Sequence, residues 1–146
     1  MGEVGSKKLV ALIDSNPNDR KSLAGAIDSF YAVSQFSEAG AALDGLRRTP
    51  PALIIVDEML APCGGYEFVG MVRGERALAA IPAVVVSALD LKSVRDSIWR
   101  CGGNGYLSKP WNTDTVLRTI SNLLNKAVEK KGSVSGACWR PAPPHM

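Results

Sequence analysis

Histidine and cysteine are scarce in this chain of 146 residues. The single histidine, His145, is next to last and follows a proline-rich stretch, so the sequence gives no basis for a histidine-dependent catalytic triad. The three cysteines, Cys63, Cys101 and Cys138, are odd in number, widely separated and without the paired spacing of metal ligands. Neither a disulfide framework nor a zinc site is therefore expected.

Long apolar runs are also lacking. No window approaches the roughly 18 consecutive apolar residues of a membrane-spanning helix. The N-terminus also has no apolar stretch of the kind that forms the core of a signal peptide. We therefore expect a cytoplasmic protein that does not bind membranes.

A strongly basic body is missing as well. The formal net charge of +3 is concentrated near the two ends, and residues 9–125 are close to neutral. A basic surface with interleaved aromatic side chains, the usual footprint of nucleic-acid binding, is therefore not expected in the folded body. Binding through the basic tail, which carries Lys126, Lys130, Lys131 and Arg140, stays open as an alternative.

What the chain does contain is a regular alternation of apolar runs of strand length with segments of helical periodicity. This alternation predicts parallel βαβ units and an α/β fold with a doubly wound, five-stranded parallel sheet. One domain accounts for the length and for the 46% hydrophobic content. The expected strands are residues 9–13, 31–36, 53–56, 84–86 and a short segment that ends before Lys109.

Capping and turn residues set the expected helix boundaries. Asn16 and Pro17 begin the first helix, which should end near Ser29, and Ser37 is expected to cap the second. The glycine-rich turn at residues 101–105 ends the fourth helix, and Asn112 begins a long amphipathic helix. The expected organisation is a flexible N-terminus (1–7), one domain (8–128) and a linker-like tail (129–146).

Polar side chains follow three of the predicted strands. Asp57, Ser87 and Lys109 each come at or just after the end of an apolar run. Because the carboxyl ends of parallel strands lie along one edge of a sheet, these three groups should converge. A nucleophilic carboxylate, a hydroxyl that binds phosphoryl oxygen and a lysine that neutralises it together indicate an aspartyl-phosphate site.

With this pattern, residues 8–128 closely resemble the receiver domain of two-component response regulators. The motifs that carry the resemblance are Leu12-Ile13-Asp14-Ser15-Asn16-Pro17 with Arg20, Val56-Asp57-Glu58-Met59 with Gly65, Val86-Ser87-Ala88, and Gly105-Tyr106-Leu107-Ser108-Lys109-Pro110. The resemblance implies a (βα)5, flavodoxin-like fold with strand order 2-1-3-4-5. It also implies a phosphoprotein that assists only its own aspartyl phosphorylation and dephosphorylation and is not an enzyme.

The resemblance further implies roles for the residues at the phosphorylation site. Asp57 would accept the phosphoryl group from a sensor histidine kinase or a histidine phosphotransfer protein. Lys109 and Ser87 would bind phosphoryl oxygens, and the small Ala88 would leave the approach open. Pro110 matches a position where the family usually has a cis peptide bond.

A Mg²⁺ ion is the cofactor that the resemblance implies. Asp14, Asp57 and the backbone carbonyl of Met59 would hold it. The family normally has a second acid after the first strand, and this chain has Ser15 there, which makes Ser15 a doubtful ligand. Because Mg²⁺ prefers carboxylates and water, we expect a weakened affinity, which the neutral amide of Asn16 would restore only in part.

Two functions remain open. In the first, phosphorylation moves Ser87 and turns Tyr106 inward, which alters the surface of the fourth helix, fifth strand and fifth helix, where partners or a second copy bind. Trp99, Tyr106 and Trp111 are the candidate partner residues on or near that surface. In the alternative, the chain is a pseudo-receiver that docks proteins without phosphorylation, because Ser15 replaces the second acid.

Overall fold

The central strands of the sheet are apolar, except for the polar residues that end two of them, because helices cover both faces. In the computed structural model, which describes residues 6–132, every residue of β3 and β4 is buried. The strands are β1 (Leu9–Ile13), β2 (Ala32–Phe36), β3 (Leu53–Asp57), β4 (Ala83–Ser87) and β5 (Gly105–Ser108). All neighbours pair in parallel in the order β2-β1-β3-β4-β5, so the predicted fold class is confirmed.

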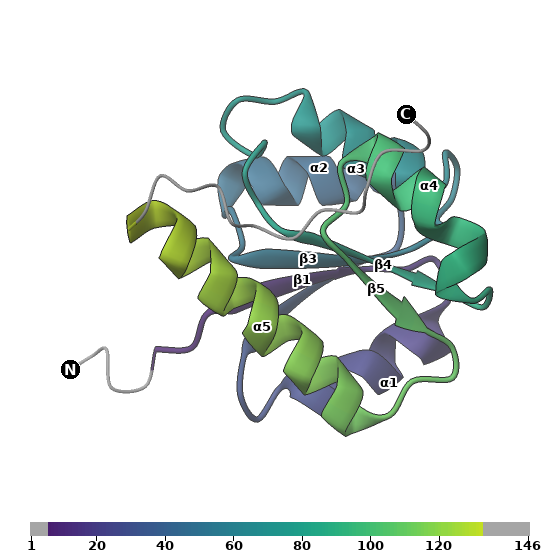
Figure 1. Ribbon diagram of the computed structural model, residues 1–146, viewed down its shortest axis with the longest axis horizontal. Coiled ribbons are helices and arrows are strands. Elements are labelled where there is room, and N and C mark those ends of the chain that lie inside the picture. The colour runs from purple at the N-terminus through teal and green to yellow at the C-terminus, as the bar shows by residue number, and fades with distance from the viewer. Residues whose placement is uncertain (1–5, 133–146) are drawn as a thin grey trace.

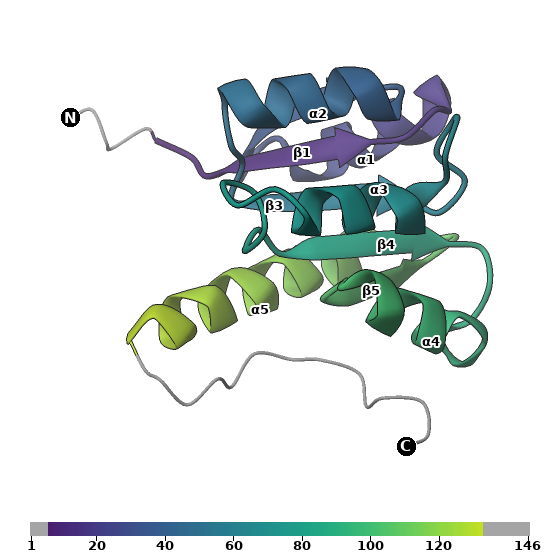
Figure 2. The ribbon, with the colours of Figure 1, turned by 90° about the horizontal axis from the view of Figure 1, so that it is seen from above.

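The five helices within residues 6–132 form two layers, one on each face of the sheet (Figures 1 and 2). The helices are α1 (Pro17–Ile27), α2 (Ala39–Arg48), α3 (Gly65–Arg73), α4 (Leu91–Cys101) and α5 (Thr113–Gly132). The helices α2, α3 and α4 pack on one face of the sheet, and α1 and α5 pack on the other. Successive strand residues point to opposite faces, so β1 contributes Ala11 to the first core and Leu12 to the second.

The local capping predictions had mixed outcomes. Asn16 caps α1, and the backbone N–H of Thr115 donates to Asn112 Oδ1 at 2.8 Å, so both asparagine caps are confirmed. The Ser37 cap is wrong, because α2 begins one residue later and its N-cap, Glu38, makes no side-chain capping bond. Gly102 has a φ of +89° at the end of α4, as the turn composition predicted.

The boundaries differ from the sequence predictions by a few residues. Helix α1 ends at Ile27, short of Ser29, and β2 begins after Tyr31. Helix α5 continues to Gly132, past the boundary expected at residue 128, so the first part of the expected tail is helical. The rest of that tail, with Cys138 and His145, and residues 1–5 lie outside the described residues. Within residues 6–132, no helix has both the length and the apolar character needed to span a membrane.

Candidate functional site

The carboxyl edge of the sheet brings an aspartate and a lysine into direct contact. Asp57 is the last residue of β3, and its side chain is only 6% exposed. Lys109 follows β5, and its Nζ donates to Asp57 Oδ2 at 2.8 Å. Ser87 ends β4 and is fully buried, and its carbonyl oxygen accepts from the backbone N–H of Lys109 at 2.8 Å. The three residues predicted from the strand ends are thus neighbours in space, with Ser87 joined to Lys109 through the backbone.

Lys109 bridges two carboxylates. Besides Asp57, its Nζ donates to Asp19 Oδ2 at 3.2 Å. Partial burial of the ammonium acts to lower the pKa of Lys109, but the hydrogen bonds to Asp57 and Asp19 outweigh it and raise that pKa. The amine is therefore a fixed positive charge at neutral pH, as a phosphoryl-binding group requires.

Asp14 lies at the end of β1, next to the same cluster, and is 9% exposed. Burial, assisted by the charge of Asp57, raises the pKa of Asp14 to about 6, although the backbone N–H of Asn16 opposes the rise through a 2.9 Å bond to Asp14 Oδ1. Arg20 donates to the backbone carbonyl of Asp14 at 2.7 Å. This last bond fixes the backbone at the end of β1.

A third carboxylate completes an acidic cluster that the sequence analysis did not find. One carboxylate oxygen from each of Asp14, Asp19 and Asp57 lies within 4.8 Å of the other two. Such a set of oxygen donors fits a hard divalent cation such as Mg²⁺. Asp19 is in the first turn of α1, where an acidic side chain is ordinarily explained by its favourable interaction with the helix dipole. The only sequence feature that could have indicated a part in the cluster is its spacing after the Asn16 cap.

Ser15 and Asn16, the two residues after Asp14, both use their side-chain oxygens in local bonds. Ser15 Oγ accepts from the backbone N–H of Ala61 at 2.8 Å, which connects the loop after β1 to the loop after β3. Asn16 Oδ1 accepts from the backbone N–H groups of Asn18 and Asp19 at 2.9 and 3.1 Å. Neither side chain brings a net charge to the cluster.

The loop after β3 holds Asp57 from its other side. The backbone N–H of Met59 donates to Asp57 Oδ1 at 3.2 Å, and the Met59 side chain is 75% exposed at the rim of the site. The N–H of Gly65 donates to the carbonyl of Glu58 at 2.9 Å, which draws the start of α3 against the end of β3. Two proline peptide bonds next to the site, Ala61–Pro62 and Lys109–Pro110, are cis.

Ser87 and Tyr106 both form hydrogen bonds to the backbone of Leu89. Ser87 Oγ accepts from the N–H of Leu89 at 2.9 Å, and the Tyr106 hydroxyl donates to the Leu89 carbonyl at 2.6 Å. Leu89 and the intervening Ala88 are exposed, and the Tyr106 ring is partly exposed. Leu89 therefore contacts both Ser87 and Tyr106, through its N–H and its carbonyl group.

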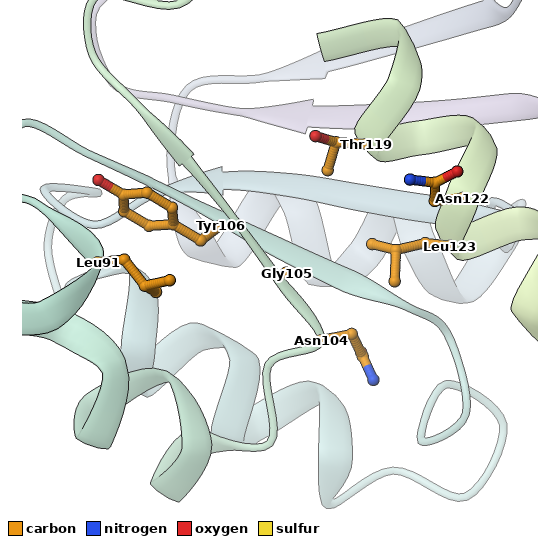
Figure 3. A pocket seen from close by; sticks show the side chains of 7 residues that line it. All are labelled: Leu91, Asn104, Gly105, Tyr106, Thr119, Asn122 and Leu123. Atoms are coloured by element: carbon orange, nitrogen blue, oxygen red, sulfur yellow. The ribbon is translucent and has the colours of Figure 1, made fainter. Parts of the chain in front are cut away.

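The candidate partner residues lie around β5. Tyr106 lines a pocket of about 240 Å³ between α4 and α5, together with Leu91, Asn104, Gly105, Thr119, Asn122 and Leu123 (Figure 3). Trp111 lines a second pocket with Asp19 and Lys109, and it packs against the core of α1 and α5. Trp99, on α4, is partly exposed, and its indole N–H is buried with no hydrogen-bond partner among residues 6–132.

Comparison with known proteins gives a consistent picture. The sequence profile of the response regulator receiver domain matches residues 10–121. Response regulator Rre1 of Synechocystis sp. is 29% identical over 115 residues, which cover 77% of this chain and 50% of Rre1. The polar-differentiation response regulator DivK of Brucella ovis is 28% identical over 121 residues, which cover 82% of this chain and 98% of DivK.

A solved structure extends the likeness to three dimensions. The receiver domain of sensor histidine kinase PA1611 from Pseudomonas aeruginosa PAO1, which has a magnesium ion coordinated in its active site cleft, superposes with a TM-score of 0.75. The two chains are 21% identical over 82% of this chain and 99% of that domain, a level at which the likeness concerns the fold.

Proposed function

The chain belongs to the response regulator receiver domain family, and we propose that it accepts a phosphoryl group on Asp57 from a phosphohistidine of a sensor histidine kinase or phosphotransfer protein. The observation that carries the proposal is the 2.8 Å contact between the buried Asp57 carboxylate and the Lys109 ammonium at the carboxyl edge of the sheet. The chain spans half the length of Rre1, so the output of the whole protein is not part of this proposal.

In the proposed reaction, a carboxylate oxygen of Asp57 attacks phosphorus. An O–P bond forms while the N–P bond of the donor imidazole breaks, and its electron pair returns to the ring nitrogen. The product is an acyl phosphate on Asp57. Lys109 neutralises charge on the transferred group, and the exposed Ala88 leaves the approach open. The protein assists only its own phosphorylation and dephosphorylation, so we do not class it as an enzyme.

The cofactor of this proposal is Mg²⁺, which supplies positive charge against the phosphoryl oxygens when bound. Asp14, Asp57 and the backbone carbonyl of Met59 would hold it, and the acidic cluster is chemically suited to a hard cation. Ser15, whose hydroxyl accepts a hydrogen bond from Ala61, adds no charge. The affinity should therefore be lower than with a carboxylate at position 15.

The switching step of the proposal uses the Ser87–Leu89–Tyr106 connection. If a phosphoryl oxygen accepted a hydrogen bond from Ser87, the Ser87 hydroxyl would move away from the Leu89 N–H. Leu89 would then shift, and with it the carbonyl group that accepts the hydrogen bond from the Tyr106 hydroxyl. Tyr106 would then turn inward and change the α4-β5-α5 surface. Effector proteins or a second copy of the chain would bind that surface in the cytoplasm, with Trp99 and Trp111 near its border.

The direct test is intact-mass spectrometry after incubation with Mg²⁺ and a small acyl phosphate, in cold and mildly acidic solution. We expect one phosphoryl adduct on the wild-type chain and none on Asp57→Asn, because an amide cannot form the mixed anhydride. A receiver of known competence, treated in parallel, controls for the reagent. An adduct of equal yield on Asp57→Asn would place the chemistry at another residue.

Ser15 also favours a second candidate, a pseudo-receiver that docks partners without phosphorylation. In that case the wild-type chain would stay free of adduct at a saturating Mg²⁺ concentration while the competent receiver reacted. The joint presence of Asp57, Ser87 and Lys109 at the carboxyl edge favours the phosphorylated switch, since a pure docking module has no use for this trio.

A further inference from the structure

We infer that Asp19 supplies to the cation site the carboxylate that position 15 lacks. The inference rests on the proposed function, because it concerns the same Mg²⁺ ion. The family resemblance assigns no part in the site to position 19, and the structure brings the Asp19 carboxylate to the cluster from the first turn of α1.

The position of Asp19 is set by the start of α1. Its backbone N–H donates to Asn16 Oδ1 at 3.1 Å, and Pro17 holds the first helical residue in a helical φ. Asp19 is the third residue of the helix, and Asp14 lies two residues before the Asn16 cap. This short connection brings the Asp19 carboxylate within 4.8 Å of the ligand atoms of Asp14 and Asp57.

The charges of the site also favour this assignment. Mg²⁺ affinity rises with the number of carboxylates around the ion, and a hydroxyl or an amide cannot replace the missing negative charge. Ser15 is bonded to Ala61, and Asn16 accepts two N–H groups of the helix. Among the described residues, Asp19 is the one further carboxylate in the cluster with Asp14 and Asp57.

Asp19 also contacts Lys109, and this contact should limit how much Asp19 contributes to Mg²⁺ binding. The ammonium lies 3.2 Å from Asp19 Oδ2, and 44% of the Asp19 side chain is exposed. A cation at the site and the Lys109 ammonium would therefore share the Asp19 carboxylate. We expect Asp19 to recover part, but not all, of the affinity that an acid at position 15 would provide.

The experiment is calorimetric titration of the full chain with Mg²⁺ at neutral pH. We expect Asp19→Asn to weaken binding by about three- to tenfold, since one carboxylate charge is lost from a partly exposed position. Asp28→Asn is the matched control, because it makes the same change in an exposed side chain at the other end of α1. It should bind Mg²⁺ as the wild type does.

Ser15→Asp separates direct ligation from other roles of Asp19. If the two positions supply the same charge, Ser15→Asp will increase Mg²⁺ affinity more in the Asp19→Asn protein than in the wild type. A Lys109→Met background tests the contact with lysine. Asp19→Asn should still weaken binding there, whereas an effect that vanished would make Asp19 only a partner of Lys109 and would overturn the inference.

The experiments distinguish failure of the Asp19 inference from failure of the proposed function. Unchanged binding in Asp19→Asn, together with loss of binding in Asp14→Asn, would overturn the inference and leave the Mg²⁺ site and the phosphorylation of Asp57 intact. No measurable binding by the wild type, with no phosphoryl adduct, would overturn both.

Discussion

Gly65→Ala should lower the free energy of unfolding by about 3 kcal/mol, near the upper end of what overpacking costs. A Cβ atom at this position would overlap the backbone oxygen of Asp57 and would lie 2.9 Å from the Cα of Glu58. These neighbours are backbone atoms at the end of a buried strand, so they cannot swing aside as a flexible side chain would. The start of α3 would have to move away from the end of β3 and from Asp57.

Urea denaturation measures this effect, and Gly70→Ala is its matched control. Gly70 is in the same helix and exposed, and a Cβ there meets nothing within 4 Å. Alanine is the better helix former, so Gly70→Ala should stabilise the protein by up to about 1 kcal/mol. Equal effects of the two substitutions would show that the approach of Gly65 to Asp57 is not as tight as described.

Elements whose cause is local in the sequence were predictable. The apolar runs of β3 and β4 are buried on both faces, and their composition alone indicates central parallel strands. The Asn16 and Asn112 caps act within three residues, so they too were visible. The Ser37 cap was wrong because α2 begins at Ala39, where the backbone N–H donates to the Ala61 carbonyl at 3.3 Å, a contact that no local pattern in the sequence contains.

The candidate site was predictable only as far as it follows strand ends. Asp57, Ser87 and Lys109 each lie at or just beyond a strand, and parallel pairing brings such positions to one edge. Asp19 lies on a helix, and its approach to Lys109 depends on how α1 packs beside the residues after β5. The Ser15–Ala61 bond similarly joins two loops 46 residues apart. No local sequence pattern indicates either of these two long-range contacts.

Asp14→Asn should raise the free energy of unfolding at neutral pH by about 2 kcal/mol when divalent cations are removed by chelation. Folding transfers the Asp14 carboxylate from water to a buried position beside Asp57, and its pKa rises from 3.8 to about 6. An ionised Asp14 thus opposes folding at pH 7. Asparagine has nearly the same shape, can still accept from the Asn16 N–H, and carries no charge.

The direction of the pH dependence follows from the sign of this shift. The folded protein binds the Asp14 proton more tightly than the unfolded chain does. The protonated Asp14 therefore contributes its full stability at pH values below the pKa that Asp14 has in the unfolded chain. That stability is lost as the pH rises through the folded pKa of about 6. The advantage of Asp14→Asn should therefore be large at neutral pH and should disappear in acid, below a pH of about 4.

Urea denaturation in chelator at both pH values tests this expectation. An advantage of equal size at both pH values would contradict the role of the charge and would point to a packing difference. Saturating Mg²⁺ at neutral pH should reduce the advantage of Asp14→Asn, because a cation that binds the folded state stabilises the wild type and binds the variant less well. The buried charge that opposes folding of the metal-free chain is thus the same charge that would hold the ion.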